Sequence, residues 1–156
     1  MHKHPSLRKE DVGLLFEAVR SLLADRGYRR RDMVWYSHTP DLIRVLSFDP
    51  GLTRIRARFV VGIALHASNG VDDTTVWDSI RPLRCRATHP QIEDCAISVG
   101  LERLVQDRSR YETVTDFTDR SRSHSESIPQ ILEFVTTYAL SFIEGFSTVE
   151  DVRRFV

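Results

Sequence analysis

Arginine recurs at every second position within Leu52–His66, and this spacing predicts a binding surface. Arg54, Arg56 and Arg58 alternate there with apolar residues. In an extended chain they would form a row on one face, about 6–7 Å apart. Guanidinium groups bind carboxylates and phosphates through paired hydrogen bonds. The row therefore predicts a surface for an acidic partner, or else a solvated face whose arginines pair with carboxylates of neighbouring strands.

Other residues extend this candidate surface. Arg44 and Arg30 precede the row in the chain, and Trp35 and Trp77 are of a type that often anchors protein interfaces. The alternative for both tryptophans is a place in or at the rim of the core. The formal net charge is zero, from 22 basic and 22 acidic residues, which argues against general affinity for phosphates. We therefore favour a protein partner with an acidic surface over nucleic acid.

A second candidate site falls in and beside the irregular segment 67–94. His66, Asp72, Asp73 and His89 carry groups that could serve acid–base chemistry. Their spacing matches no usual set of metal ligands, so we predict no metal and no cofactor. This segment supports the alternative function, a small enzyme or nucleic-acid-processing factor with an unrecognised site.

Neither cysteine defines a catalytic centre. Cys95 alternates with apolar residues, which predicts a buried thiol. Cys85 lies between two arginines that would favour its thiolate, but no base accompanies it. The sequence also lacks the glycine-rich phosphate loops and the serine-hydrolase elbow. We assign no catalytic residue and expect a non-enzymatic protein.

Alternation and capping signals predict the elements that position these residues. Ser6 and Gly27 bound a helix that ends near Arg26, and a capping box at Ser127–Gln130 opens a helix over 128–144. A second box, Ser147–Glu150, opens a short terminal helix. Period-two patterns separated by turns predict strands at 32–37, 42–48, 53–66, 94–102 and 111–117.

The order of these elements predicts an α+β fold. Strands in one run with helices at the ends give a single antiparallel sheet of about five strands, with an N-terminal helix and two C-terminal helices. The long helices would pack on one sheet face and leave the other open. We expect one domain over 1–156, with a frayed end at 1–6, an irregular insertion at 67–94 and a polar linker at 118–126.

Several of these features together resemble a bacterial family of domains of unknown function, numbered 4304. The resemblance covers about residues 10 to 145. It rests on Gly27-Tyr28-Arg29-Arg30 after the first helix, the aromatic strand Met33–Tyr36, Cys95-Ala96-Ile97, and the pair Gly100-Leu101 before a C-terminal amphipathic helix. It implies a small α+β domain of bacterial type without an assigned activity.

The chain departs from that family at two places. The polar run that tends to end the family's second strand is replaced by Ser47-Phe48-Asp49-Pro50, and Val61 stands where an Asn tends to precede the glycine. If those polar residues serve a shared site, this chain lacks it.

Composition places the chain among globular proteins outside membranes. The hydrophobic fraction is 41%, no apolar run approaches 18 residues, and the first ten residues lack an apolar signal core. We expect a cytoplasmic protein that binds no membrane. The function that we predict is a protein-binding module, such as a bacterial immunity or accessory protein, that uses its arginine-rich sheet face.

Overall fold

The computed structural model describes residues 9–49, 58–65, 91–116 and 124–155. Its elements are, in chain order, α1 (Lys9–Asp25), β1 (Arg29–Arg31), β2 (Val34–His38), β3 (Leu42–Asp49), β4 (Arg58–Leu65), the 3-10 helix η1 (Ile92–Asp94), β5 (Ile97–Gly100), α3 (Leu101–Leu104), α4 (Arg108–Val114), α5 (His124–Phe134), the π-helical segment η2 (Val135–Leu140), α6 (Ser141–Glu144) and α7 (Val149–Phe155). This is the predicted α+β fold.

The five strands form one antiparallel sheet in the order β1-β2-β3-β4-β5. Strands β2, β3 and β4 confirm the three predicted consecutive strands, and β5 lies within the predicted range 94–102. The first part of the range 53–66 and its last residue fall outside the described residues. Each strand is hydrogen-bonded to the next one along the chain, so the sheet is a simple meander.

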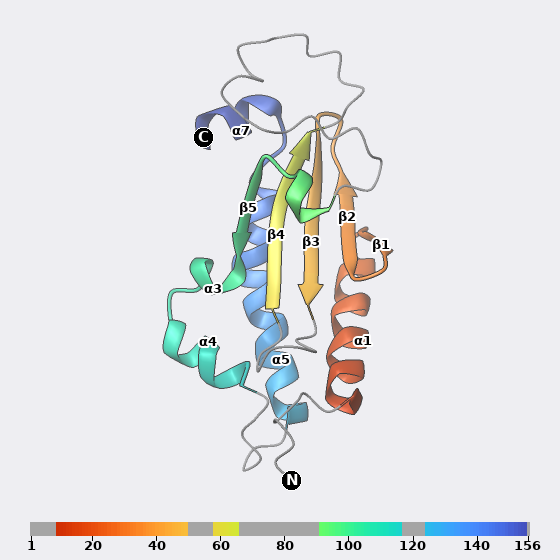
Figure 1. Cartoon of the computed structure of the whole chain (residues 1–156), viewed down its shortest axis with the longest axis vertical. Helices are drawn as coiled ribbons and strands as arrows, with labels where there is room; N and C mark the ends of the chain where they lie inside the picture. Colours follow the sequence, from red (N-terminus) through yellow and green to blue (C-terminus); the bar gives the residue numbers. More distant parts are fainter. Residues whose placement is uncertain (1–8, 50–57, 66–90, 117–123, 156) are drawn as a thin grey trace.

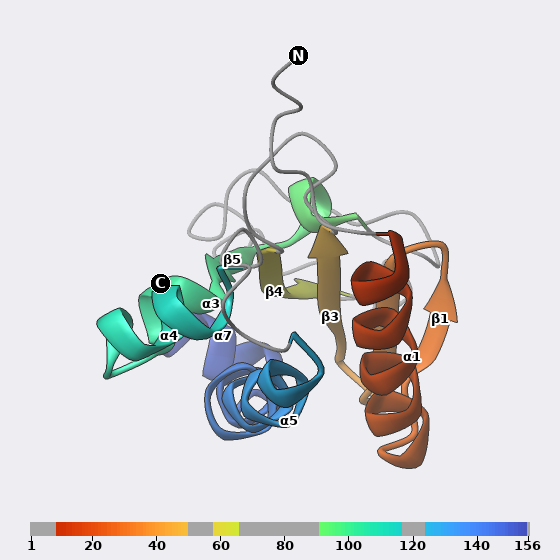
Figure 2. The ribbon, with the colours of Figure 1, turned by 90° about the horizontal axis from the view of Figure 1, so that it is seen from below.

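Helix α1 and the continuous C-terminal helix α5–η2–α6 cover one face of the sheet (Figures 1 and 2). We call this the helix face. Side chains of alternate strand positions meet the apolar stripes of both helices there, as the pattern predicts. Its largest fully buried side chains include Trp35, Phe48, Phe59, Leu15, Leu23, Leu42, Leu46, Ile63 and Ile131.

The opposite face, which we call the outer face, is not open throughout, contrary to the prediction. A second buried cluster lies there, made of Val34, Tyr36, Ile43, Val45, Ala64 and Cys95. Ile92 of η1 packs against this cluster, and η1 lies over β3 and β4 (Figure 1). The prediction was wrong here because β4 carries small or apolar residues on both faces beyond Arg58. At the other end of this face, Ser47, Asp49, Arg58 and Val60 are partly or fully exposed.

One predicted strand was assigned wrongly, and one strand was not predicted. Residues 111–114, within the predicted strand 111–117, are helical instead: α4 spans Arg108–Val114, and the side chain of Asp107 caps it by accepting a hydrogen bond from the Arg110 amide at 3.0 Å. The fifth strand is instead β1, three arginines at the sheet edge. Tyr111 and Val114 are both buried on one face of α4. Two apolar residues three positions apart lie on the same face of a helix, so this segment also fits a helical pattern.

Two capping boxes were also misplaced. Helix α5 begins at His124, so Ser127 is a buried residue inside it, and the predicted linker 118–126 overlaps its first turn. In α7 the cap is Thr148 rather than Ser147. The Asp151 carboxylate accepts hydrogen bonds from the Ser147 and Thr148 amides at 2.9 and 3.0 Å, which hold its pKa below the usual value.

Candidate protein-binding surface

The predicted arginine row is described only at Arg58, which does lie on the outer face. In the register of β3 and β4 it stands opposite Asp49. Its guanidinium group lies 3.7 Å from the carboxylate of Glu102, and both side chains are partly exposed. The Glu102 carboxylate lies over Gly100, where a Cβ would meet it, so a larger residue at position 100 would require this flexible side chain to shift. At Arg58, therefore, the structure favours an arginine paired with a carboxylate from a neighbouring element.

Arg44 belongs to the helix face and not to the arginine row, so that part of the prediction was wrong. Alternation along β3 points its side chain toward the end of α6. There its guanidinium group donates hydrogen bonds to the carbonyl oxygens of Phe146, at 2.9 and 3.1 Å, and of Glu144, at 3.2 Å. Carbonyls at a helix end lack partners within the helix. Arg44 therefore fastens the end of α6 to the sheet.

Removing this contact is expected to cost stability. For Arg44→Ala we expect a loss of about 1–2 kcal/mol in the free energy of unfolding, because charge-assisted hydrogen bonds to partly buried carbonyls are lost. Arg20→Ala is the matched control, since Arg20 is an exposed arginine that pairs with Glu17 on its own helix. Urea unfolding measures both. Equal small losses for the two variants would show that the Arg44 bonds contribute little.

The end of α1 fixes the start of β1. Gly27 has a φ of +84°, and the Tyr28 amide donates to the Leu23 carbonyl at 2.9 Å, which closes the helix in a Schellman motif. This confirms the predicted role of Gly27. The Tyr28 hydroxyl donates to the Glu144 carboxylate at 3.2 Å. Burial, assisted by the charge of Glu144, raises the pKa of Tyr28, so the phenol keeps the proton that it donates.

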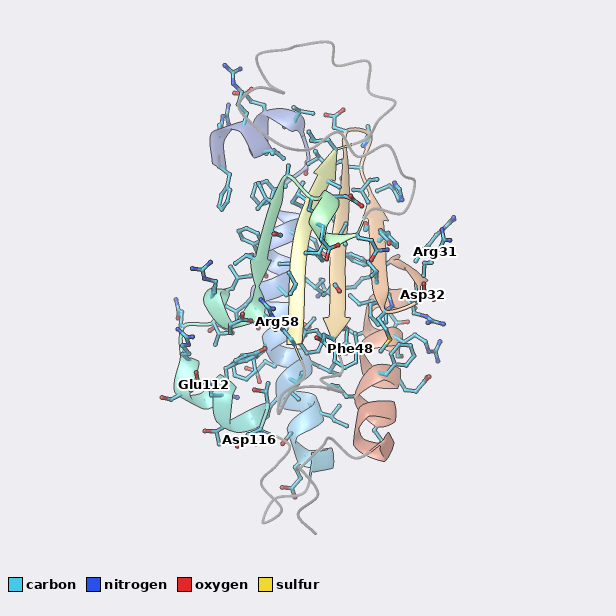
Figure 3. The ribbon with its side chains drawn as sticks, viewed as in Figure 1. Arg31, Asp32, Phe48, Arg58, Glu112 and Asp116 are labelled. Atoms are coloured by element: carbon cyan, nitrogen blue, oxygen red, sulfur yellow. The ribbon has the colours of Figure 1, made fainter. Side chains whose placement is uncertain are left out.

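The three residues of β1, Arg29–Arg31, are all exposed, and we call them the basic edge. Arg29 and Arg31 pair with Tyr36 and Val34, which places them on the outer face. Arg31 extends away from the sheet (Figure 3). Arg30 lies on the helix face, where its guanidinium group is 5.2 Å from the ring centre of Phe16 and donates to the Asp32 carbonyl at 2.8 Å.

Trp35 is a core residue, so its assignment to the binding surface was wrong. Its side chain is only 1% exposed, and its ring centre lies 5.7 Å from that of Phe16 in α1. The alternative that the sequence left open, a tryptophan that fills the core, is the one the structure supports. Position 35 alternates with Val34 and Tyr36, which are buried on the outer face, so β2 is buried on both sides.

The other candidate residues fall outside the described part of the chain. These are Arg54, Arg56 and Trp77 of the binding surface, and His66, Asp72, Asp73 and His89 of the alternative site, together with Cys85. Cys95 is described and buried, as predicted. Within the four described ranges, no three residues of the metal-binding types gather into a possible metal site. No helix in those ranges is both long and apolar enough to cross a membrane.

Sequence reasoning placed Arg30 on the candidate surface but did not predict that Arg29–Arg31 form a strand. Three consecutive arginines carry no apolar alternation, so the strand pattern gives no signal there. The one local signal is the pair Asp32-Met33, which joins β1 to β2 as a two-residue turn with a positive φ of 54° at Asp32. Aspartate is among the few residues besides glycine that adopt this conformation readily.

Comparison with known proteins finds no match for this chain among family models, curated proteins or solved structures. The resemblance to the 4304 family therefore stays a prediction.

Proposed function

We propose that this protein is a non-enzymatic protein-binding module that recognises an acidic protein surface through the basic edge. The observation that carries the proposal is a strand built entirely of exposed arginines at the border of the sheet. The five residues from Arg29 to Met33 hold three guanidinium groups and one carboxylate, that of Asp32. Such a local excess of positive charge steers and selects partners of opposite charge.

The contacts that hold this strand in place support the proposal. The Schellman motif and the Tyr28–Glu144 hydrogen bond hold the residues immediately before β1, and the pairing with β2 holds β1 itself. Arginines on an ordered strand lose less freedom on binding than arginines on an unconstrained chain. Neutralising or scaffolding a partner, as a bacterial immunity or accessory protein does, is the biological role that we propose for such a surface.

The test is capture of a partner from the native host. We expect the wild-type protein to retain a stoichiometric acidic protein, and Arg29→Glu/Arg31→Glu to bind it at least tenfold more weakly, because two attractive charges become repulsive. Arg153→Glu/Arg154→Glu is the matched control, since it makes the same charge change at exposed residues of α7. Circular dichroism checks that all three proteins are folded.

Two results would contradict the proposal. One is capture that is equally strong in the β1 variant and the wild type. The other is equal weakening in the β1 and α7 variants, which would point to net charge rather than a specific surface.

A further inference from the structure

The backbone of β1 offers a hydrogen-bonding position on the side away from β2. The Phe48 amide donates to the Met33 carbonyl at 3.0 Å, so the odd-numbered residues at this end of β2 direct their backbone groups toward β3. Their even-numbered neighbours, Val34 and Tyr36, therefore face β1, where they pair with Arg31 and Arg29. Arg30, between those two, directs its N–H and C=O groups away from β2.

We infer that β1 accepts an additional strand from the partner, an extended acidic segment that continues the sheet. This inference rests on the proposed function and specifies how the partner binds. Strand β1 ends the sheet order, so the outward groups of Arg30 face no described strand. Strand addition at such an edge takes its affinity from backbone hydrogen bonds and its specificity from alternate side chains.

Charge complementarity identifies the occupant. In an added strand, every second side chain would lie on the outer face, beside Arg29 and Arg31, at the distance of directly opposed residues, about 5 Å. Carboxylates at those positions would pair with the two guanidinium groups. An apolar strand would bring no carboxylate to these two guanidinium groups, and a basic strand would be repelled by them. The favoured occupant is therefore a segment with glutamate or aspartate at every second position.

Short, charged edge strands also occur where proteins prevent unwanted pairing. If the arginines of β1 serve to prevent pairing, no strand should bind there. If β1 accepts a partner strand, an acidic strand should bind, so a binding measurement separates the two explanations. An acidic segment is the one kind of strand that arginines at an edge would attract rather than repel.

The experiment titrates the full chain with an acetylated, amidated peptide of alternating glutamate and threonine, monitored by amide NMR shifts. Arg30→Pro removes the outward N–H but no hydrogen bond to β2, and proline is tolerated at such an edge position. Arg30→Ala is the matched control, because it loses the same guanidinium group and keeps the N–H. We expect the peptide to shift the β1 amides and to bind Arg30→Pro at least tenfold more weakly than Arg30→Ala.

A second measurement uses the wild-type protein alone, in case Arg30→Pro does not fold. N-methylation of the peptide amide that faces the Arg30 carbonyl should weaken binding at least tenfold, and a scan along the peptide should show this effect only at alternate positions. No binding of the peptide overturns the inference, as does binding that is insensitive to both changes. The latter result would mean attraction by charge alone, as a nucleic acid would also show.

The same variants separate this inference from the proposed function. If Arg29→Glu/Arg31→Glu releases the partner from the host and Arg30→Pro retains it as well as Arg30→Ala does, the partner binds through arginine side chains without strand addition. In that case the proposed function stands and the inference fails. If Arg29→Glu/Arg31→Glu also retains the partner, both fail.

Discussion

Trp35→Ala is expected to lower the free energy of unfolding by about 3–5 kcal/mol, the cost of removing a large aromatic side chain from a packed core. The indole is 1% exposed, and it touches Phe16 of α1 from the sheet side. A loss of this size is a large share of the total stability of a small domain. Urea unfolding, followed by circular dichroism, measures it.

Phe155→Ala is the control for Trp35→Ala. Phe155 also contacts aromatic rings, those of Phe142 and Phe146, but it is 57% exposed. Its removal should cost about 1 kcal/mol or less, because much of its surface stays in water in the folded protein. If the two variants lose similar small amounts, Trp35 is not the core residue described here, and its assignment to a binding surface would have to be reconsidered.

Gly62→Ala is expected to destabilise the protein by about 2–3 kcal/mol, an overpacking cost in the central region of the sheet. A Cβ at position 62 would lie 2.7 Å from the sulfur of Cys95 and 3.0 Å from the backbone oxygen of Ile97. The sulfur belongs to a side chain that is buried, and the oxygen to a backbone paired with β4. The oxygen cannot move away without disturbing β5, and the sulfur has little room to move because the Cys95 side chain is buried.

Gly13→Ala makes the same glycine-to-alanine change, but we expect it to stabilise the protein. Nothing lies within 4 Å of a Cβ at Gly13, which is exposed in α1. Alanine there should raise the free energy of unfolding by about 0.5–1 kcal/mol, because glycine is a poor helix former. Thermal and urea unfolding compare the two variants. A stabilising Gly62→Ala would contradict the close packing of Cys95 against β4.

Much of the fold follows from local sequence patterns. Apolar alternation in β3 and β4, with turn residues between strands, predicts the antiparallel sheet, and Gly27 marks the end of α1. The pattern failed where two periods fit the same residues. Tyr111, Val114 and Thr115 satisfy a strand alternation in part and a helix face fully, and the Asp107 cap decides for α4.

The candidate site could be predicted only in part, because its partners are distant in the sequence. Alternation alone did not show that Arg58 and Arg44 lie on opposite faces of the sheet, because that follows from the register of β3 and β4. It does not reveal that Glu102 pairs with Arg58, or that Arg44 binds carbonyls about a hundred residues away in the chain. Those contacts depend on tertiary packing.

The strand β1 was not predicted for another reason, although Arg30 was named as a candidate binding residue. Edge strands exposed on both faces carry no burial pattern, and β1 has no apolar residue at all. Its strand character comes from pairing with β2 through a two-residue turn.

Hydrogen exchange of the full chain, alone and with the protein captured from its host, tests the central claim most directly. The account predicts slower exchange in the partner complex at Arg30, whose amide faces away from β2, and little change at α7. Unchanged exchange across Arg29–Arg31, with protection appearing elsewhere in the chain, would contradict the basic edge as the partner's binding site.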